Sequence, residues 1–172
     1  MTIEFEKDYV VRFGVGDLFK TCNCGQSMRL ELRKLIHEKR IRICHVPVYS
    51  CQACKKYELL PLIKPHLLRY IASLGHGTER LRVSFADVNE AAYVLREVFR
   101  TYVDESTVDE EDQELQARCR EAFDERINML LDLFCCAQGM KDEEWMKQIE
   151  GRLEQLSALK TLIPENSGYF AR

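Results

Sequence analysis

The sequence predicts an α+β fold, in which a β-rich N-terminal module precedes a helical region. Three observations lead to this prediction. Apolar and polar residues alternate through much of the first fifty residues, which is the two-residue period of half-buried strands. Two close cysteine pairs stand at either end of one such stretch. From about residue 60 onward, apolar residues recur every three or four positions, as they do in amphipathic helices.

The predicted strands lie within a module of residues 1–60. Ile3 and Phe5 alternate with charged residues. Between residues 28 and 50 the alternation returns, first at Leu30 and Leu32 and then at Ile41 and Ile43. Glu38-Lys39-Arg40 separates these last two runs. We therefore expect a hairpin with its turn at residues 38–40.

The second module, residues 61–172, is predicted to be helical, with three or four helices. Between the first two helices, Leu81, Val83 and Phe85 fit either a short strand or an extended linker. Gly139 is expected to end the third helix, and Asp142 to cap the fourth. The predicted helices span about 61–74, 86–103, 112–138 and 141–162.

Length and composition restrict the class of protein. A chain of 172 residues has room for one domain, or for a small module joined to a helical one. Apolar residues at 46% and charged residues at 31% are globular values. The start of the chain lacks the pattern of a secretory signal, and no stretch approaches about 18 uninterrupted apolar residues. We expect a cytoplasmic protein that does not enter a membrane and keeps its eight cysteines reduced.

The two cysteine pairs, Cys-Asn-Cys-Gly and Cys-Gln-Ala-Cys, are separated by 26 residues with strand character. A tetrahedral metal needs four ligands at about 2.3 Å, which two tight chain reversals can supply from opposite ends of a β hairpin. We expect one structural zinc ion, with Cys44 or His45 as a reserve ligand. An iron–sulfur cluster and a reversible dithiol switch are the alternatives. The four expected ligands are Cys22, Cys24, Cys51 and Cys54.

These pairs and their neighbours resemble a known family. The Cys-Asn-Cys-Gly run at 22–25 and the Val-Pro-Val-Tyr-Ser-Cys run at 46–51 are similar to the YgiT-type zinc finger. This zinc ribbon also forms the N-terminal part of zinc-binding antitoxins. The resemblance covers residues 20–60 and implies that the four cysteines are the ligands. The first pair is one residue shorter than usual there, and Lys55-Lys56 replaces the usual Gly-Glu. We find no convincing copy of the helix-turn-helix domain that follows in the antitoxins.

Charge is distributed unevenly along the chain. Residues 1–82 carry a net charge of +7, and residues 83–172 carry −10. A basic hairpin could contact the phosphates of a nucleic acid, which makes a nucleic-acid-binding transcriptional regulator one alternative function. A thiol-based redox sensor is the other. The residues of this predicted nucleic-acid contact are Arg29, Arg33, Lys34, Lys39, Arg40 and Arg42.

The function that we expect is a zinc-ribbon regulatory or adaptor protein without enzymatic activity. The sequence contains no phosphate loop, nucleophile elbow or HExxH motif. Phe134, Trp145 and the leucines of the last two helices exceed what one helical hairpin can bury. These helices are therefore expected to bind a protein partner or to form a homodimer. The remaining cysteines, Cys119, Cys135 and Cys136, are expected to be buried as small apolar residues.

Overall fold

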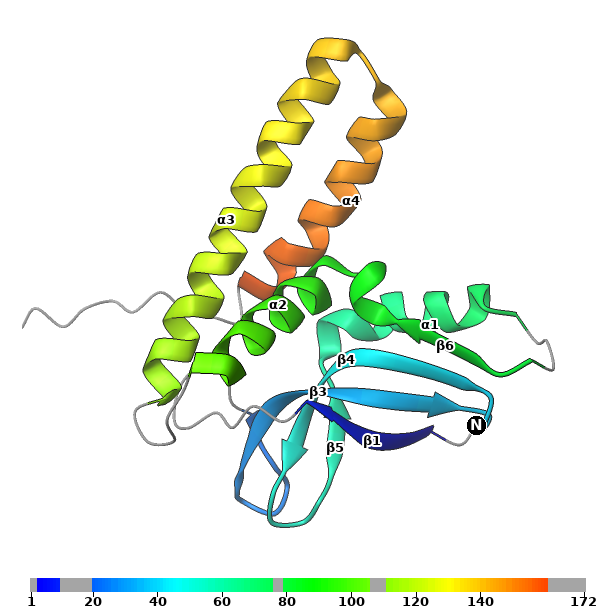
Figure 1. Ribbon diagram of the computed structural model, residues 1–172, viewed down its shortest axis with the longest axis vertical. Coiled ribbons are helices and arrows are strands. Elements are labelled where there is room, and N and C mark those ends of the chain that lie inside the picture. Colours follow the sequence, from blue (N-terminus) through cyan, green and yellow to red (C-terminus); the bar gives the residue numbers. More distant parts are fainter. Residues whose placement is uncertain (1–2, 10–19, 76–78, 106–110, 161–172) are drawn as a thin grey trace, which may run out of the picture.

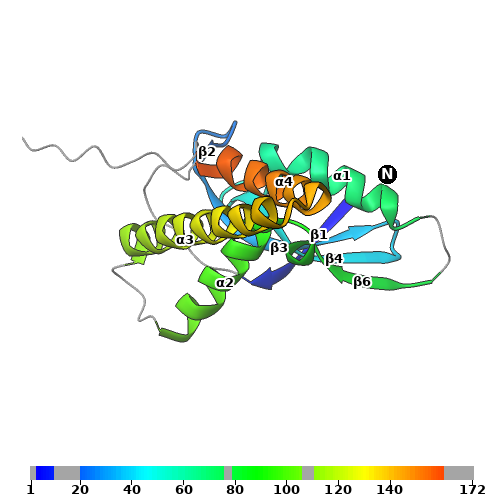
Figure 2. The same ribbon diagram turned by 90° about the horizontal axis from the view of Figure 1, so that it is seen from above.

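The computed structural model describes residues 3–9, 20–75, 79–105 and 111–160, and it has mixed α and β architecture (Figure 1). An N-terminal sheet is followed by four α-helices within these ranges, as the sequence predicts at this level. The last two helices form a hairpin that projects away from the sheet (Figure 1), and its two helices lie side by side when seen from above (Figure 2). The sheet is open, with its strands in the order β1-β3-β4-β5.

The β3–β4 hairpin is the centre of the sheet. It pairs in antiparallel fashion from Met28 with Cys51 to His37 with Ile41. β1 and β2 pair with β3, whereas β5 and β6 pair with β4, β6 in parallel. In the described part of the chain the strands are β1 (Ile3–Tyr9), β2 (Lys20–Thr21), β3 (Ser27–His37), β4 (Ile41–Cys51), β5 (Tyr57–Leu59) and β6 (Leu81–Ser84).

A bulge bends this hairpin near its middle. Between the pairs Arg33–Val46 and Leu35–Ile43, β4 has one residue more than β3. His45 lies in this interval with a left-handed φ of 57°. An extra residue of this kind increases the local twist of the strand. The His45 ring is held by β6, because its Nδ1 lies 2.8 Å from the Ser84 Oγ.

The helices agree with the predicted ones except at their ends. α2 begins several residues later than predicted because Asn89 caps it, its Oδ1 accepting from the Ala92 N–H at 2.9 Å. Among the described residues, no helix is long and apolar enough to cross a membrane. The α-helices are α1 (Lys64–Ser73), α2 (Glu90–Glu105), α3 (Glu111–Met140) and α4 (Glu143–Lys160), and the 3₁₀ helices η1 (Pro61–Ile63) and η2 (Phe85–Asp87) precede α1 and α2.

The connection between α3 and α4 corrects one expectation. Gly139 does not end a helix, because α3 continues through it to Met140. The chain reverses at Lys141 instead, with a left-handed φ of 57°. Asp142 caps α4 as predicted, with its Oδ1 accepting from the Trp145 N–H at 3.0 Å.

One continuous apolar core joins the sheet to all four α-helices. It contains Leu32 and Val48 from the sheet, Leu67 from α1, Phe99 from α2 and Leu130 from α3, all fully or almost fully buried. The sequence placed a boundary near residue 60, yet β6 lies beyond that point and still belongs to the sheet. The sheet therefore takes strands from both sides of that position.

The turn of the β3–β4 hairpin provides a test of stability. The Arg40 N–H donates to the His37 carbonyl at 3.1 Å, and both central residues are left-handed, with φ of 52° at Glu38 and 55° at Lys39. Such turns favour Asn-Gly, because a side chain makes this conformation costly. We expect Lys39→Gly to raise the free energy of unfolding by about 1 kcal/mol, measured by urea denaturation.

The matched control is Lys147→Gly, which changes an exposed lysine inside α4. Glycine inside a helix should lower the free energy of unfolding by about 1 kcal/mol. Destabilisation by both substitutions would contradict the assigned turn.

Candidate metal centre

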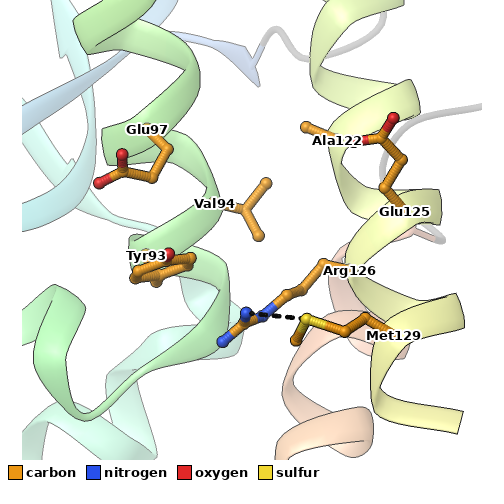
Figure 3. A pocket seen from close by; sticks show the side chains of 7 residues that line it. All are labelled: Tyr93, Val94, Glu97, Ala122, Glu125, Arg126 and Met129. Atoms are coloured by element: carbon orange, nitrogen blue, oxygen red, sulfur yellow. Dashed lines mark hydrogen bonds between the residues drawn. The ribbon is translucent and has the colours of Figure 1, made fainter. Parts of the chain in front are cut away.

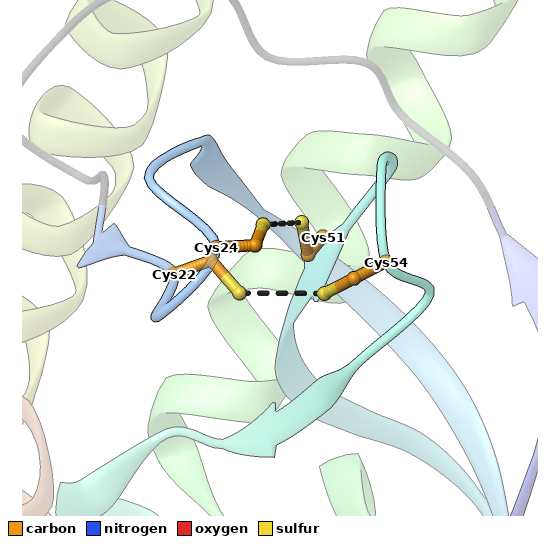
Figure 4. Close-up of side chains that lie close together, drawn as sticks. All are labelled: Cys22, Cys24, Cys51 and Cys54. Carbon is orange, nitrogen blue, oxygen red and sulfur yellow. Dashed lines mark hydrogen bonds between the residues drawn. The ribbon is translucent and has the colours of Figure 1, made fainter.

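The four cysteines predicted as metal ligands converge where the two chain reversals meet (Figure 4). Their sulfur atoms all lie within 4.8 Å of one another, with 3.5 Å from Cys22 to Cys54 and 3.5 Å from Cys24 to Cys51. Sulfur ligands of one tetrahedral zinc ion, each at about 2.3 Å, lie about 3.8 Å apart. A disulfide would require about 2.05 Å. The four thiols can therefore hold one metal ion.

The first ligand pair lies in a tight turn between β2 and β3. The Cys22 N–H donates to the Gln26 carbonyl at 2.8 Å, and the Gly25 N–H donates to the Cys22 carbonyl at 2.8 Å. Gly25 has a φ of 84°, which glycine adopts without the steric cost that a Cβ would cause. The glycine after the first pair therefore allows the turn that brings Cys22 and Cys24 together.

The second pair has a turn with a similar backbone course. The Lys55 N–H donates to the Cys51 carbonyl at 3.0 Å, and the Cys51 N–H donates to the Lys56 carbonyl at 2.9 Å. Lys55 follows Cys54 as Gly25 follows Cys24, and its φ of 61° is left-handed as well. The lysine thus occupies a conformation that glycine would adopt more easily.

The ligands differ in their exposure to solvent. Cys22 is 3% exposed and Cys51 is 1% exposed, and both belong to the apolar core. Cys24 and Cys54, the second cysteine of each pair, are exposed. Each turn is therefore attached to the core by one ligand and presents the other ligand to solvent.

The local electrostatics favour a bound cation. The backbone N–H of Cys54 donates to the Cys51 sulfur, and it is the main cause that lowers the pKa of Cys51 to about 6. The Lys56 N–H acts in the same direction on Cys54, but the sulfur atoms of Cys22 and Cys51 outweigh it and raise the pKa of Cys54 to about 12. Thiolates this close together repel one another unless a positive charge compensates them. A bound metal ion would supply that charge and displace the protons.

A buried ion pair supports the second turn, a role that was not predicted from the sequence. Glu31 is fully buried in β3, and its Oε2 accepts from the Arg33 Nε at 2.7 Å. Gln52, inside the second cysteine pair, donates from Nε2 to the Glu31 Oε1 at 3.1 Å. The Arg33 guanidinium lies over the Tyr57 ring, 5.1 Å from its centroid. The spacing of Glu31 and Arg33 by two was the available signal, since strand residues two apart share a face.

The reserve ligands lie elsewhere in the sheet. Cys44 is buried in β4, and His45 contacts Ser84. Among the described residues, the group that could hold a metal contains the four cysteines and no other side chain.

The six basic residues of the predicted nucleic-acid contact have different environments. Arg33 is 4% exposed and paired with Glu31. Arg40 donates to the backbone carbonyl of Gly75 at 2.7 Å and to that of Glu79 at 3.3 Å. Of the others, Lys39 and Arg42 are exposed, and Arg29 and Lys34 are half-buried. Because Arg33 is inside the protein, a phosphate-binding surface here would have to do without it.

The remaining cysteines fall into two groups. Cys119 is fully buried, and burial raises the pKa of its thiol to about 12, which fits its expected role as a small apolar residue. Cys135 and Cys136 are both exposed on α3, so the expectation that they are buried is wrong for this pair. Apolar residues occupy more than one face of α3. Sequence spacing alone therefore did not distinguish the buried face from the exposed face that carries Cys135 and Cys136.

A second polar cluster, which was also not predicted from the sequence, joins α2 to the hairpin of α3 and α4. Glu90 is 9% exposed and accepts from the Arg126 Nε at 2.7 Å and from the Arg152 Nε at 2.6 Å. Gln155 of α4 accepts from the Glu90 N–H at 2.9 Å and from Asn89 Nδ2 at 3.2 Å. The first turn of α2 is therefore bonded to both α3 and α4. An Asn-Glu dipeptide before an apolar run was a signal for the start of the helix.

Comparison with known proteins adds no family to this geometry. No protein-family model, curated protein or solved structure matches the chain. The resemblance of residues 20–60 to a zinc ribbon therefore depends on the motif residues alone.

His66 of α1 contacts the polar cluster around Glu90 through Asn89, and it makes the stability of the protein depend on pH. Its Nδ1 lies 3.0 Å from Asn89 Nδ2, so the ring accepts a hydrogen bond there in its neutral form. Burial and, secondarily, the charge of Arg69 lower the pKa of His66. As pH falls below about 6.5, the unfolded chain gains a proton at His66 before the folded chain does. The free energy of unfolding should therefore fall between pH 7 and pH 5.

We expect His66→Gln, which can still accept from Asn89, to reduce this fall when urea unfolding is measured at pH 7, 6 and 5. An identical pH dependence in the wild type and the variant would contradict the assignment.

Proposed function

We propose that the chain is a zinc-ribbon regulatory or adaptor protein. Zinc would be bound by Cys22, Cys24, Cys51 and Cys54, and the helical hairpin would bind a protein partner. The convergence of four thiols within 4.8 Å supports this proposal most directly. Four sulfur donors in a tetrahedron form a closed site, which is typical of structural zinc, whereas catalytic zinc keeps a position open for water.

The donor set and the distances also favour one zinc ion over the alternatives. Cysteines that bind an iron–sulfur cluster divide among two or four iron atoms, so some of their sulfur atoms lie further apart than ligands of one ion. Thiolate donors select soft or borderline metals such as zinc and disfavour magnesium and calcium. The resemblance of residues 20–60 to the YgiT-type zinc finger points in the same direction.

The adaptor role is supported by the shape of the molecule. α3 and α4 pack against each other and extend beyond the rest of the protein as an arm (Figure 1). Glu90 joins the base of this arm to α2 through Arg126 and Arg152. The polar cluster would therefore hold the arm in a defined orientation relative to the zinc-bound sheet.

The test is the metal content of protein purified under reducing conditions. We expect one zinc ion per chain by elemental analysis, and less than about a tenth of that for Cys51→Ser/Cys54→Ser, because two remaining ligands cannot form a closed site. Amide hydrogen exchange should accelerate in residues 20–24 and 49–57 of this variant, where the turns lose their link.

The matched control is Cys135→Ser/Cys136→Ser, which removes the same number of thiols from the exposed face of α3. It should retain full zinc content and wild-type exchange. Wild-type protein without stoichiometric metal, or equal metal loss in both double variants, would overturn the proposed zinc site.

A further inference from the structure

The arm formed by α3 and α4 is covered by α2 only at its base. Glu90, in the first turn of α2, bonds to Arg126 on α3 and to Arg152 on α4, and this contact marks the upper limit of α2 on the arm. α3 continues for 14 residues beyond Arg126, which corresponds to about 21 Å of helix. The outer part of the arm thus projects past α2 (Figure 1).

A row of five apolar residues and Arg126 runs along one side of α3. Its six members follow one another at alternating intervals of four and three residues, the spacing of a coiled-coil seam. Leu130 and Ala137, on the neighbouring face, are fully buried, whereas Met129 is 39% exposed and Met140 is 72% exposed. α3 therefore has a second, largely apolar face. The described residues leave Met129, Cys136 and Met140 on this face exposed, whereas Ala122 and Leu133 are half-buried against the core. We call this row the α3 seam: Ala122, Arg126, Met129, Leu133, Cys136 and Met140.

The N-terminal half of the α3 seam, from Ala122 to Met129, lies in a groove between α2 and α3 (Figure 3). The Arg126 guanidinium lies over the Tyr93 ring, 4.5 Å from its centroid, and its Nη1 is 3.6 Å from the Met129 sulfur. The groove has a volume of about 250 Å³ and is lined by Tyr93, Val94, Glu97, Ala122, Glu125, Arg126 and Met129.

The C-terminal half of the seam, from Leu133 to Met140, continues this surface toward the tip of the arm. On α4, Trp145 precedes Arg152 by seven residues, so both lie along one line of the helix. Arg152 faces α2 through its bond to Glu90. Trp145, which is half-buried, therefore lies on the same side of the arm as the α3 seam.

The charges beside the seam are acidic. Glu121, Glu125 and Asp132 are exposed along its outer edge. Residues 128–150, which form the outer arm, contain five carboxylates and two lysines, for a net charge of −3. A second copy of the arm would place like charges opposite one another, which is unfavourable. A basic helix would place opposite charges there.

We propose that the α3 seam binds an amphipathic helix of another protein, whose apolar row is flanked by lysine and arginine. The helix would lie in the groove between α2 and α3 and continue along the outer arm beside Trp145. From Ala122 to Met140 the seam covers 18 residue steps, or about 27 Å, so the partner helix has about five turns. This inference rests on the proposed role of the arm and specifies the chemistry of its partner.

The test uses a labelled synthetic peptide of 21 residues, with leucine at the seam positions of three heptads and lysine at the flanking positions. We expect fluorescence anisotropy to show binding to the full chain, weakened at least about tenfold by Met129→Lys or Leu133→Lys. A peptide with glutamate in place of lysine should bind at least about tenfold more weakly, and added salt should weaken the lysine peptide.

The matched control is Leu131→Lys, which alters an equally exposed apolar residue on a different face of α3. It should change the dissociation constant less than about twofold. Equal weakening by Leu131→Lys, equal binding of both peptides, or absence of binding would overturn the proposal. Sedimentation velocity on the free chain supplies a further outcome. A dimer that Met129→Lys dissociates would assign the seam to a second copy and would also overturn the proposal.

Zinc content and helix content, measured on the same samples, separate this proposal from the proposed function. If the wild-type protein is zinc-loaded and fully helical but does not bind the lysine peptide, only the proposed basic partner helix is rejected. If the protein purifies without zinc but binds the lysine peptide more tightly than the glutamate peptide, the proposed basic partner helix is supported and the proposed zinc site is rejected.

Discussion

The convergence of four sulfur atoms is the constraint that joins the turn before β3 to the turn after β4. Cys22 and Cys51 are in the apolar core, while Cys24 and Cys54 reach the same point from the solvent side. Thiolates this close together repel one another, so the arrangement is favourable when a cation compensates their charge. With a metal bound, the chain before β3 and the chain after β4 would be held at one position, and β5, η1 and α1 would continue from there.

Two separate polar clusters inside the protein restrict the geometry of the second cysteine turn and of the arm. Gln52 of the second turn bonds to the buried Glu31, and Glu31 is neutralised by Arg33. Further along the chain, Glu90 bonds to one arginine of α3 and to one of α4. A buried charge that loses its partner is strongly destabilising, so each cluster restricts the geometry of the elements that it joins. The orientation of the arm is therefore determined by specific bonds in addition to apolar packing.

Several residues show which features of the structure the local sequence pattern predicts and which it does not. Close cysteine pairs at the ends of a predicted hairpin led directly to the candidate site, because both the turns and the ligands are local features. The alternation at Leu30 and Leu32 and at Ile41 and Ile43 likewise predicted β3 and β4. Arg33 was counted among the residues of the predicted nucleic-acid contact, although it is 4% exposed. Its burial depends on Glu31 and Tyr57, and the charge of a residue does not reveal such partners.

By itself, the sequence determined the α+β class, the hairpin, the succession of helices and the four cysteines that meet. These properties follow from periodicity and ligand spacing, which act over a few residues or across one turn. The tertiary structure decided that β6 joins the sheet, that Glu90 bonds to both helices of the arm and that the α3 seam stays partly exposed. Each of these outcomes depends on which distant segments pack together. Apolar residues on two sides of one helix do not indicate which side will be covered.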